Sequence, residues 1–326
     1  MRVFVHSAIC GLAVILLAGC STVTPAQREA GDRMARMMAA RFDTPADKPF
    51  FLRGGPNAAL FVHGFPGTPA QLRPFAEALH AQGWTVRGVQ MPGNGSDTAR
   101  MSSLTGQEWI DTVRNAVAEM SSHYKRVLVV GYSMGAAMSC ASLAPENVDG
   151  LVLIAPYQWR ENVAETFVWT FFRPLMPKLY QPFKSSDFSK PATRALLSEY
   201  FPQEFLDQPA YREEIRSYTV SIPLIAQLRS TVRSAYGRKW KDARIPIMIL
   251  QGTEDKTALP SRSRALAARW GVRSQYIELP GDHLFIKPGS PAFPGIVHDL
   301  CLFAAKLAAK PPTHKQCGIG GAVHAR

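Results

Sequence analysis

A serine stands at the centre of the pentapeptide Gly131-Tyr132-Ser133-Met134-Gly135. The apolar run RVLVV precedes it and the small-residue run AAMSCASLA follows it, as expected where a buried strand turns sharply into a helix. Such a turn strains the backbone of its central residue and projects the side chain, and only small neighbours let strand and helix approach so closely. The pentapeptide alone would also suit a simple glycine-rich turn. With a strand before it and a helix after it, the pattern favours Ser133 as a nucleophile.

His283 is the candidate base. A serine hydroxyl is a poor nucleophile at neutral pH, and histidine is the side chain whose pKa suits acceptance of its proton. His283 stands in LPGDHLF, directly after an expected strand at 275–279. A loop at the carboxyl edge of a parallel sheet would bring it over Ser133. The other histidines are interpreted as surface residues, except His63, which we expect to brace a loop.

The imidazole needs an acceptor on its second nitrogen to hold its tautomer and stabilise its charged form. Asp255 follows the apolar run IPIMIL and should lie at the same edge of the sheet as Ser133. Glu254 and Asp282 are competing candidates, and a cap or turn is the structural alternative for Asp255. The chain order serine, acid, histidine favours Asp255.

Negative charge on a substrate carbonyl oxygen requires donors that are already in place. One is the backbone N–H of Met134, the residue after the candidate nucleophile. The second is expected from the turn HGFPGT that follows the first apolar strand. Pro66 has no N–H, which leaves Phe65 as the donor.

Strands and helices, which differ in the spacing of their apolar residues, must position these side chains. Short apolar runs typical of buried strands alternate with segments of helical period. Strands are expected at 58–63, 85–91, 126–130, 151–155, 245–250 and 275–279, and helices at 72–79, 109–120, 262–270 and 296–307. The alternation predicts the α/β class with a doubly wound, mostly parallel sheet. Between 156 and 245 no clear strand appears, and the interval is too long for a loop, so we predict an inserted helical cap.

The domain organisation follows from these patterns. We predict a signal peptide at 1–19, a tether and N-terminal helix at 20–50, an α/β core at 51–156 and 245–310, a cap at 157–244 and a disordered tail at 311–326.

The first twenty residues have the layout of a secretory signal, with Arg2 ahead of an apolar run that is too short for a membrane span. The ending Leu17-Ala18-Gly19-Cys20 resembles the bacterial lipoprotein signal. That resemblance implies a lipid-modified Cys20 that anchors the chain in a bacterial cell envelope, at the outer membrane facing the periplasm. The alternative is an ordinary cleaved signal and a soluble periplasmic protein.

Composition excludes several classes. Of 326 residues 46% are hydrophobic and 19% charged, which is typical of a globular protein. The net charge of +12 suits an anionic membrane surface or an acidic substrate, or is spread over a solvated surface. No nucleic-acid motif accompanies it, so no nucleic-acid partner is predicted. The five cysteines show no metal-ligand spacing, so no metal is expected. A Cys301–Cys317 disulfide is permitted in an oxidising compartment.

Four motifs occur in order along the chain: HGFPGT, GYSMG, GTEDKTALP and PGDHLF. On these motifs the chain resembles the α/β-hydrolase superfamily, in particular its carboxylesterase, monoacylglycerol lipase and lysophospholipase-like branch, over about residues 55–310. The resemblance implies a Ser133–His283–Asp255 triad, an oxyanion hole at Phe65 and Met134, a cap over the pocket and no cofactor. Residues 43–57 are too few for the full set of leading strands of larger members, which predicts a trimmed sheet.

The same resemblance implies an ester hydrolase that forms an acyl-enzyme on a small ester or lipid: an acyl glycerol, a lysophospholipid or a short-chain ester. Thioesterase, acyltransferase and amidase or peptidase activities use the same triad and stay open, as does a non-catalytic envelope lipoprotein that retains the fold. The oligomeric state is not predicted.

Aromatic residues crowd the start of the insertion, and four of them are candidate substrate contacts: Tyr157, Trp159, Phe167 and Trp169. They would line an acyl-chain tunnel or dip into a bilayer surface. The alternative is that they form a small core of the cap itself.

Overall fold

The computed structural model describes residues 25–159, 166–167, 169, 171, 179–181, 183–198, 201, 203–271 and 274–310. The chain forms two compact units. The sheet unit consists of the described residues of Phe42–Gly95, Gly106–Trp159 and Ser230–Arg326, and the helical unit of those of Met1–Arg41, Ser96–Thr105 and Arg160–Arg229. The predicted signal peptide, Cys20 and the predicted tail lie outside the described residues.

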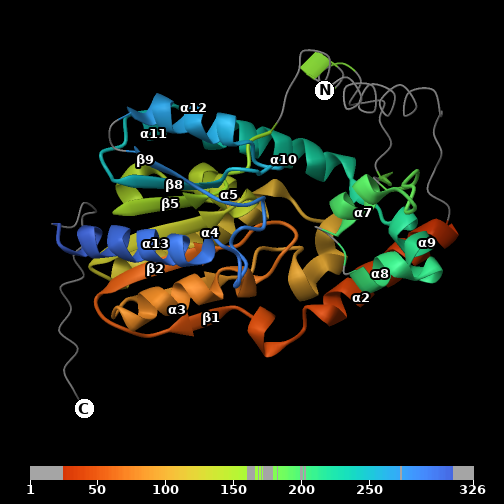
Figure 1. Ribbon diagram of the computed structural model, residues 1–326, viewed down its shortest axis with the longest axis horizontal. Helices are drawn as coiled ribbons and strands as arrows, with labels where there is room; N and C mark the ends of the chain where they lie inside the picture. The colour runs from red at the N-terminus through yellow and green to blue at the C-terminus, as the bar shows by residue number, and fades with distance from the viewer. Residues whose placement is uncertain are drawn as a thin grey trace. The chain divides into compact units, whose positions relative to one another are not determined.

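A seven-stranded sheet with the order β1-β3-β2-β4-β5-β8-β9 forms the centre of the sheet unit (Figure 1). Its strands are β1 (Phe50–Leu52), β2 (Asn57–Val62), β3 (Thr85–Val89), β4 (Arg126–Tyr132), β5 (Gly150–Ile154), β8 (Ile247–Gly252) and β9 (Ser274–Leu279). All neighbouring strands are parallel except β1, which pairs antiparallel with β3. The α/β class with a mostly parallel sheet is therefore confirmed.

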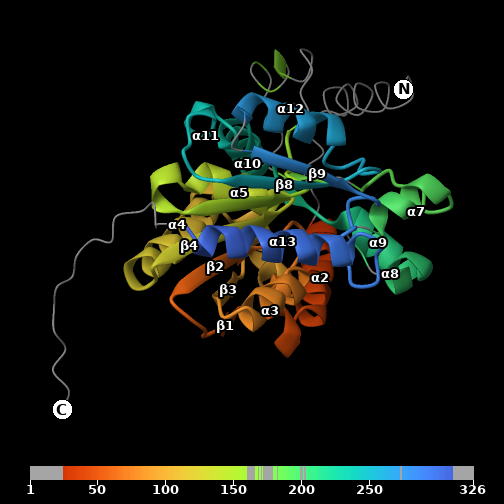
Figure 2. The ribbon, with the colours of Figure 1, turned by 60° about the vertical axis from the view of Figure 1, so that its left-hand side comes forward.

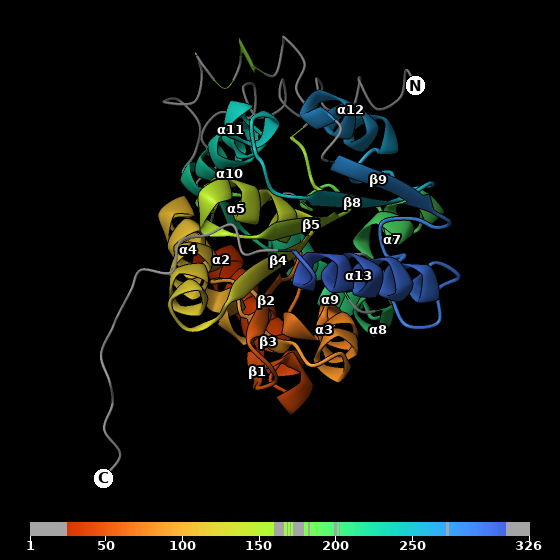
Figure 3. The same ribbon diagram turned by 90° about the vertical axis from the view of Figure 1, so that its left-hand side faces the viewer.

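Helices cover both faces of this sheet (Figure 3). On one face lie α4 (Gly106–His123) and α5 (Met134–Ser142), and on the other α3 (Arg73–Ala81) and α13 (Phe293–Ala308). Every residue of β4, β5 and β8 is buried, which explains why these strands read as unbroken apolar runs. Each strand and helix predicted for the core is present, with ends shifted by three residues or fewer.

The remaining elements of the sheet unit are short or flank the last strands. They are α11 (Arg238–Lys241), α12 (Pro260–Trp270) and the 3₁₀ turns η1 (Pro45–Asp47), η2 (Pro69–Gln71) and η4 (Pro145–Asn147). Strand β9 runs beside β8 at one edge of the sheet (Figure 2). Strand β1, at the other edge, was not predicted, because three residues are too few to show an alternating pattern.

The helical unit is built around an antiparallel strand pair and several helices. Its elements are α2 (Pro25–Arg41), η3 (Gly95–Ser102), β6 (Leu179–Tyr180), α7 (Pro191–Leu197), α8 (Gln203–Asp207), α9 (Pro209–Ser217) and β7 (Val220–Ser221). Helix α10 (Ile222–Ala235) begins in this unit and ends in the sheet unit. Helix α2 packs against α9, with Arg33 Nε 3.3 Å from Glu214 Oε1.

The unit boundaries differ from the predicted ones. Residues 96–105, predicted within the core, belong to the helical unit, and residues 42–50, predicted within the tether, belong to the sheet unit. The predicted N-terminal helix is present as α2, but it belongs to the same unit as the insertion. The insertion contributes 160–229 to that unit instead of 157–244, because the chain beyond residue 229 packs back on the sheet unit. Trp240 shows this packing, since its indole N–H donates to the Cys140 carbonyl at 3.0 Å and its ring lies 6.2 Å from that of Trp270. None of the helices in the described part of the chain has both the length and the hydropathy that a membrane crossing requires.

Candidate active site

Ser133 occupies the sharp turn between β4 and α5. Its backbone has φ +52° and ψ −117°, a strained conformation for a residue with a side chain. The flanking glycines make the turn possible. A Cβ at Gly131 would lie 2.7 Å from Ala136 Cα, and one at Gly135 would lie 2.1 Å from the Val62 carbonyl oxygen. The strand therefore turns into a helix with the serine side chain at the carboxyl edge of the sheet.

The three side chains of the predicted triad lie in one hydrogen-bonded line. His283 Nε2 is 2.9 Å from Ser133 Oγ, and His283 Nδ1 is 2.8 Å from Asp255 Oδ2. A carboxylate only accepts, so Nδ1 carries the imidazole proton and Nε2 has a lone pair toward the serine hydroxyl. All three residues are buried and follow β4, β8 and β9 at the same edge of the sheet.

The competing acids do not contact the imidazole within the described residues. Glu254 is exposed, and Asp282 Oδ1 accepts a 2.8 Å hydrogen bond from the Leu284 amide. Asp255 is the carboxylate that the structure brings to His283.

Four donors surround the Asp255 carboxylate. Oδ1 accepts from the amides of Thr257 (2.8 Å) and Ala258 (2.7 Å). Oδ2 accepts from His283 and from the side-chain amide of Gln251 at 3.1 Å. The Gln251 amide also approaches the carbonyl oxygens of Gly252 and Ala258, and its own oxygen accepts from the Ser263 hydroxyl at 2.7 Å. Such complete pairing offsets the desolvation of a carboxylate that is 2% exposed.

His63 braces the loop that carries Phe65. Its Nε2 accepts from the Met91 amide at 3.0 Å, which leaves Nδ1–H to donate to the Gly64 carbonyl at 2.8 Å. Burial lowers the pKa of His63 from 6.5 to about 4, against the opposing hydrogen bond to Gly64, so the ring is neutral at neutral pH. The carbonyl of Gly64 and the N–H of Phe65 belong to one peptide plane and point in opposite directions. By holding the carbonyl, His63 also fixes the direction of the Phe65 N–H.

Gln71 holds the same loop from η2. Its side-chain oxygen accepts from the Gly64 amide at 3.0 Å, and its side-chain nitrogen donates to the Pro66 carbonyl at 3.3 Å. Among the turn and loop contacts of the described residues, the N–H groups of Phe65 and Met134 have no acceptor. At the start of a helix such a free N–H is expected for Met134, because the first turn has no partner for it.

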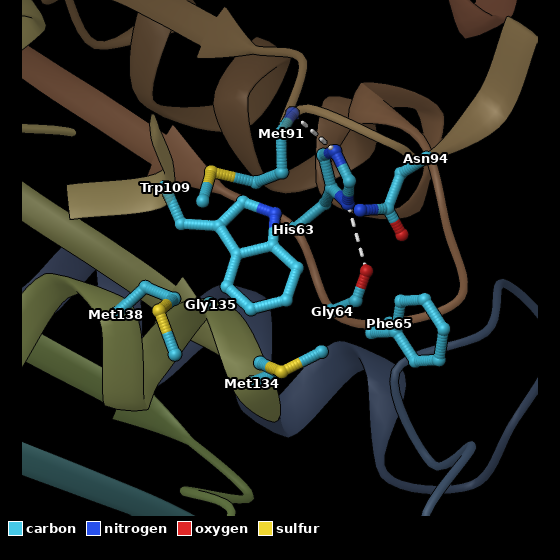
Figure 4. A pocket seen from close by; sticks show the side chains of 9 residues that line it. All are labelled: His63, Gly64, Phe65, Met91, Asn94, Trp109, Met134, Gly135 and Met138. Carbon is cyan, nitrogen blue, oxygen red and sulfur yellow. Dashed lines mark hydrogen bonds between the residues drawn. The ribbon is translucent and has the colours of Figure 1, made fainter. Parts of the chain in front are cut away.

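Phe65 and Met134 both line a small cavity of about 10 Å³ (Figure 4). It is lined by His63, Gly64, Phe65, Met91, Asn94, Trp109, Met134, Gly135 and Met138. The volume is that of about one water molecule, so this cavity holds no acyl chain as it stands.

The four candidate substrate residues are divided between the two units. Tyr157 and Trp159 belong to the sheet unit, where their rings form an edge contact at 6.4 Å. Phe167 and Trp169 belong to the helical unit. Phe167 is 53% exposed and its ring lies 4.7 Å from that of Phe171, and Trp169 lies under the Arg229 guanidinium. None of the four lines the cavity beside Phe65.

Comparison with known proteins decides the family. The family model described as "Alpha/beta hydrolase family" matches residues 59–291. The chain belongs to the alpha/beta hydrolase family. A thermostable monoacylglycerol lipase of Bacillus sp. (strain H-257) is 34% identical over 92 residues, which are 28% of this chain and 37% of that one. A carboxylesterase of Bacillus subtilis (strain 168) is 29% identical over 93 residues, 28% of this chain and 38% of that one. The matched segments thus span little more than a third of each curated relative.

Solved structures similar to this alpha/beta hydrolase have the same fold. One comes from work on LipS and LipT, two metagenome-derived lipolytic enzymes. It has a TM-score of 0.59 at 20% identity, and the alignment covers 80% of this chain and 98% of that one. The monoacylglycerol lipase of Paleococcus ferrophilus has a TM-score of 0.54 at 18% identity and covers 78% and 99%. At these identities the likeness concerns the fold alone.

The sequence reasoning did not single out Gln251, Gln71 or the hydroxyl of Tyr132. Each contacts a site residue through a side-chain hydrogen bond: Gln251 with the Asp255 carboxylate, Gln71 with the Gly64 amide and Tyr132 with the His283 carbonyl. The available signal was position: Gln251 is a polar residue at the end of an apolar strand, where a buried amide needs partners.

Proposed function

We propose that this alpha/beta hydrolase cleaves carboxylic esters through Ser133, with His283 as base and Asp255 as the group that orients and stabilises the imidazole. The observation that carries the proposal is the pair of contacts at His283, 2.9 Å to Ser133 Oγ and 2.8 Å to Asp255 Oδ2. Hydrogen-bonded serine, imidazole and carboxylate are what nucleophilic acyl transfer requires.

The reaction proceeds in two steps. Ser133 Oγ attacks the ester carbonyl carbon while His283 Nε2 takes the hydroxyl proton, and the carbonyl oxygen becomes an oxyanion. The N–H groups of Phe65 and Met134 donate to that oxyanion. The tetrahedral intermediate collapses, the alcohol leaves with the proton from His283, and an acyl-enzyme remains. A water molecule deprotonated by His283 then attacks the acyl carbon and releases the acid and Ser133.

The proposed substrates are small esters or lipids: an acyl glycerol, a lysophospholipid or a short-chain ester. The partial similarity to a monoacylglycerol lipase and a carboxylesterase supports this class. The aromatic residues Tyr157, Trp159, Phe167 and Trp169 are proposed to contact the acyl chain.

The test is hydrolysis of p-nitrophenyl esters of increasing acyl length, followed by monoacylglycerols and lysophospholipids. Wild-type protein is expected to turn over at least one chain length, and folded Ser133→Ala none above background. A folded wild-type protein that is inactive on every substrate would favour a non-catalytic envelope lipoprotein. Transfer to a thiol or an alcohol in place of water would favour an acyltransferase.

We also propose that lipid attached at Cys20 anchors the chain to the outer membrane, facing the periplasm. The support is the Leu-Ala-Gly-Cys ending of the apolar leader. Cys20→Ala is expected to move the protein from the membrane fraction to the soluble fraction. Unchanged membrane retention of that variant would contradict lipidation at Cys20.

A further inference from the structure

Tyr132, the residue before the proposed nucleophile, reaches the loop that carries the proposed base. It ends β4 and is 2% exposed. Its hydroxyl donates a 2.7 Å hydrogen bond to the backbone carbonyl of His283. No step of the proposed reaction uses this hydroxyl, so the contact has another consequence.

The tyrosine ring also contacts the imidazole itself. The ring centroids of Tyr132 and His283 are 5.3 Å apart with an angle of 29° between the planes, an offset stack. The hydroxyl contact restrains the backbone of His283, and the stack restrains the tilt of its ring. Because Asp255 already holds Nδ1, these contacts leave Nε2 a narrow range of positions relative to Ser133.

The same ring adjoins the loop that carries Phe65. A Cβ at Gly64 would lie 2.8 Å from Tyr132 Cδ1 and 3.1 Å from Ser133 Cβ. Only glycine fits between these atoms without a shift. The tyrosine ring therefore limits how closely the peptide of Gly64 and Phe65 approaches Ser133.

We propose that Tyr132 is a positioning residue that sets His283 and the Phe65 N–H at their working distances from Ser133. Its catalytic consequence rests on the proposed function, whereas its effect on the His283–Asp255 contact does not. Loss of the hydroxyl would leave the buried His283 carbonyl without this donor, and the loop would shift to find another partner.

The kinetic test is Tyr132→Phe, which removes one oxygen and keeps the ring. We expect kcat to fall about tenfold with KM within about twofold, since the reacting groups are misplaced while the surfaces that bind substrate are unchanged. The matched control is Tyr276→Phe. The Tyr276 hydroxyl lies 3.2 Å from the Pro260 carbonyl oxygen and 2.6 Å from the Glu278 carboxylate, so within the described residues its hydrogen bonds go to partners outside the triad. Loss of the Tyr276 hydroxyl is expected to leave kcat unchanged.

A second readout does not depend on turnover. The Nδ1 proton of a histidine bonded to a carboxylate gives a resolved downfield proton NMR signal. In Tyr132→Phe we expect this signal of His283 to broaden through faster exchange, whereas Tyr276→Phe retains the wild-type signal. If wild-type protein hydrolyses no ester, the proposed function fails while this signal still tests the role of Tyr132.

The proposal is overturned if folded Tyr132→Phe has the kcat of wild type and an unchanged His283 signal. Should that variant not fold, Tyr132→Leu, which lacks both the hydroxyl and the ring, takes its place: kcat is expected to fall at least as far, and wild-type kcat with an unchanged His283 signal would overturn the proposal.

Discussion

Two loops of the site are each held by a glutamine, but not in the same way. In the acid loop, residues 251–258, Gln251 is fully buried. With the amides of Thr257 and Ala258 and the imidazole of His283, it makes up four hydrogen bonds to Asp255. The oxyanion loop is the turn at residues 63–68 that carries Phe65. Gln71, which holds it, is only partly buried and makes two hydrogen bonds, to the Gly64 amide at 3.0 Å and the Pro66 carbonyl at 3.3 Å. The Phe65 amide on that loop has no acceptor among the turn and loop contacts of the described residues.

The difference follows from the charge that each loop serves. Asp255 is a permanent buried anion in the proposed mechanism, so its solvation must be replaced in full by fixed donors. The oxyanion exists only during reaction, so its donors must be held in direction yet left unoccupied. The acid loop should therefore be sensitive to any lost contact, and the oxyanion loop more tolerant.

The largest effect should come from the acid itself. Asp255→Asn replaces the acceptor of the His283 Nδ1 proton with an amide and favours the wrong tautomer, so kcat should fall about 10⁴-fold. Steady-state kinetics on the best p-nitrophenyl ester measure this. Glu254→Gln, at the exposed neighbouring position, is the control and should retain wild-type kcat. If kcat fell as far in Glu254→Gln as in Asp255→Asn, the assignment of Asp255 as the carboxylate that orients His283 would be contradicted.

The second effect is the pH dependence of the free energy of unfolding, to which His63, at the start of the oxyanion loop, contributes. The pKa of His63 is about 4 in the folded chain and 6.5 in the unfolded one, so only the unfolded chain takes up this proton as the pH falls from 6.5 to 4. The contribution of His63 to the free energy of unfolding is complete above pH 6.5 and should decline by about 3 kcal/mol by pH 4. Urea unfolding at several pH values measures it.

Two histidine variants isolate that effect. His63→Gln should lack this part of the pH dependence, whereas His123→Gln, at an exposed helix end, should retain it. Equal pH dependence in wild type and His63→Gln would show that His63 is not the buried neutral group described above.

The third effect concerns Gln251, the glutamine that bonds to Asp255. Gln251→Met keeps the volume but removes a donor to the Asp255 carboxylate. Hydrogen bonds to charged groups contribute more than neutral ones, so kcat should fall roughly 10- to 100-fold. Ser263→Ala, which removes only the hydroxyl bonded to Gln251, should cause a smaller loss in the same direction. Full activity of Gln251→Met would contradict the need for complete pairing at Asp255.

The smallest effect is expected at Gln71. Gln71→Met removes two neutral hydrogen bonds from the oxyanion loop, and His63 still holds the Gly64 carbonyl. We expect kcat to fall about threefold to tenfold with little change in KM, because the oxyanion donors act in the transition state. A loss greater than that of Gln251→Met would reverse the comparison between the two loops.

The sequence predicted what local pattern determines. The alternation of apolar strands with helical segments predicted the α/β class. The positions of Ser133, Asp255 and His283 directly after strands predicted that they lie at one sheet edge. Patterns of this kind do not report side-chain hydrogen bonds over long separations. Tyr132 acts through such a contact, with the His283 carbonyl 151 residues along the chain. Gln251 and Gln71 bond to partners four and seven residues away, but periodicity does not tell where a polar side chain of a turn points.

Unit boundaries were also beyond the sequence pattern. Helix α2 was predicted, but its packing against α9, where Arg33 and Glu214 are 181 residues apart, depends on complementary surfaces that periodicity does not show. The return of Trp240 to the sheet unit is a similar case. The short β1 strand was missed because its pairing with β3 alone defines it.

The most direct test of the account is covalent labelling of Ser133. A fluorophosphonate probe should add one phosphonyl group to wild-type protein, and peptide mass spectrometry should find it on the peptide that contains Ser133. His283→Ala should label far more slowly, and Ser133→Ala should not label at all. Labelling of Ser133→Ala to the same extent as wild type, or an adduct on another residue, would contradict the central claim that this serine is the nucleophile.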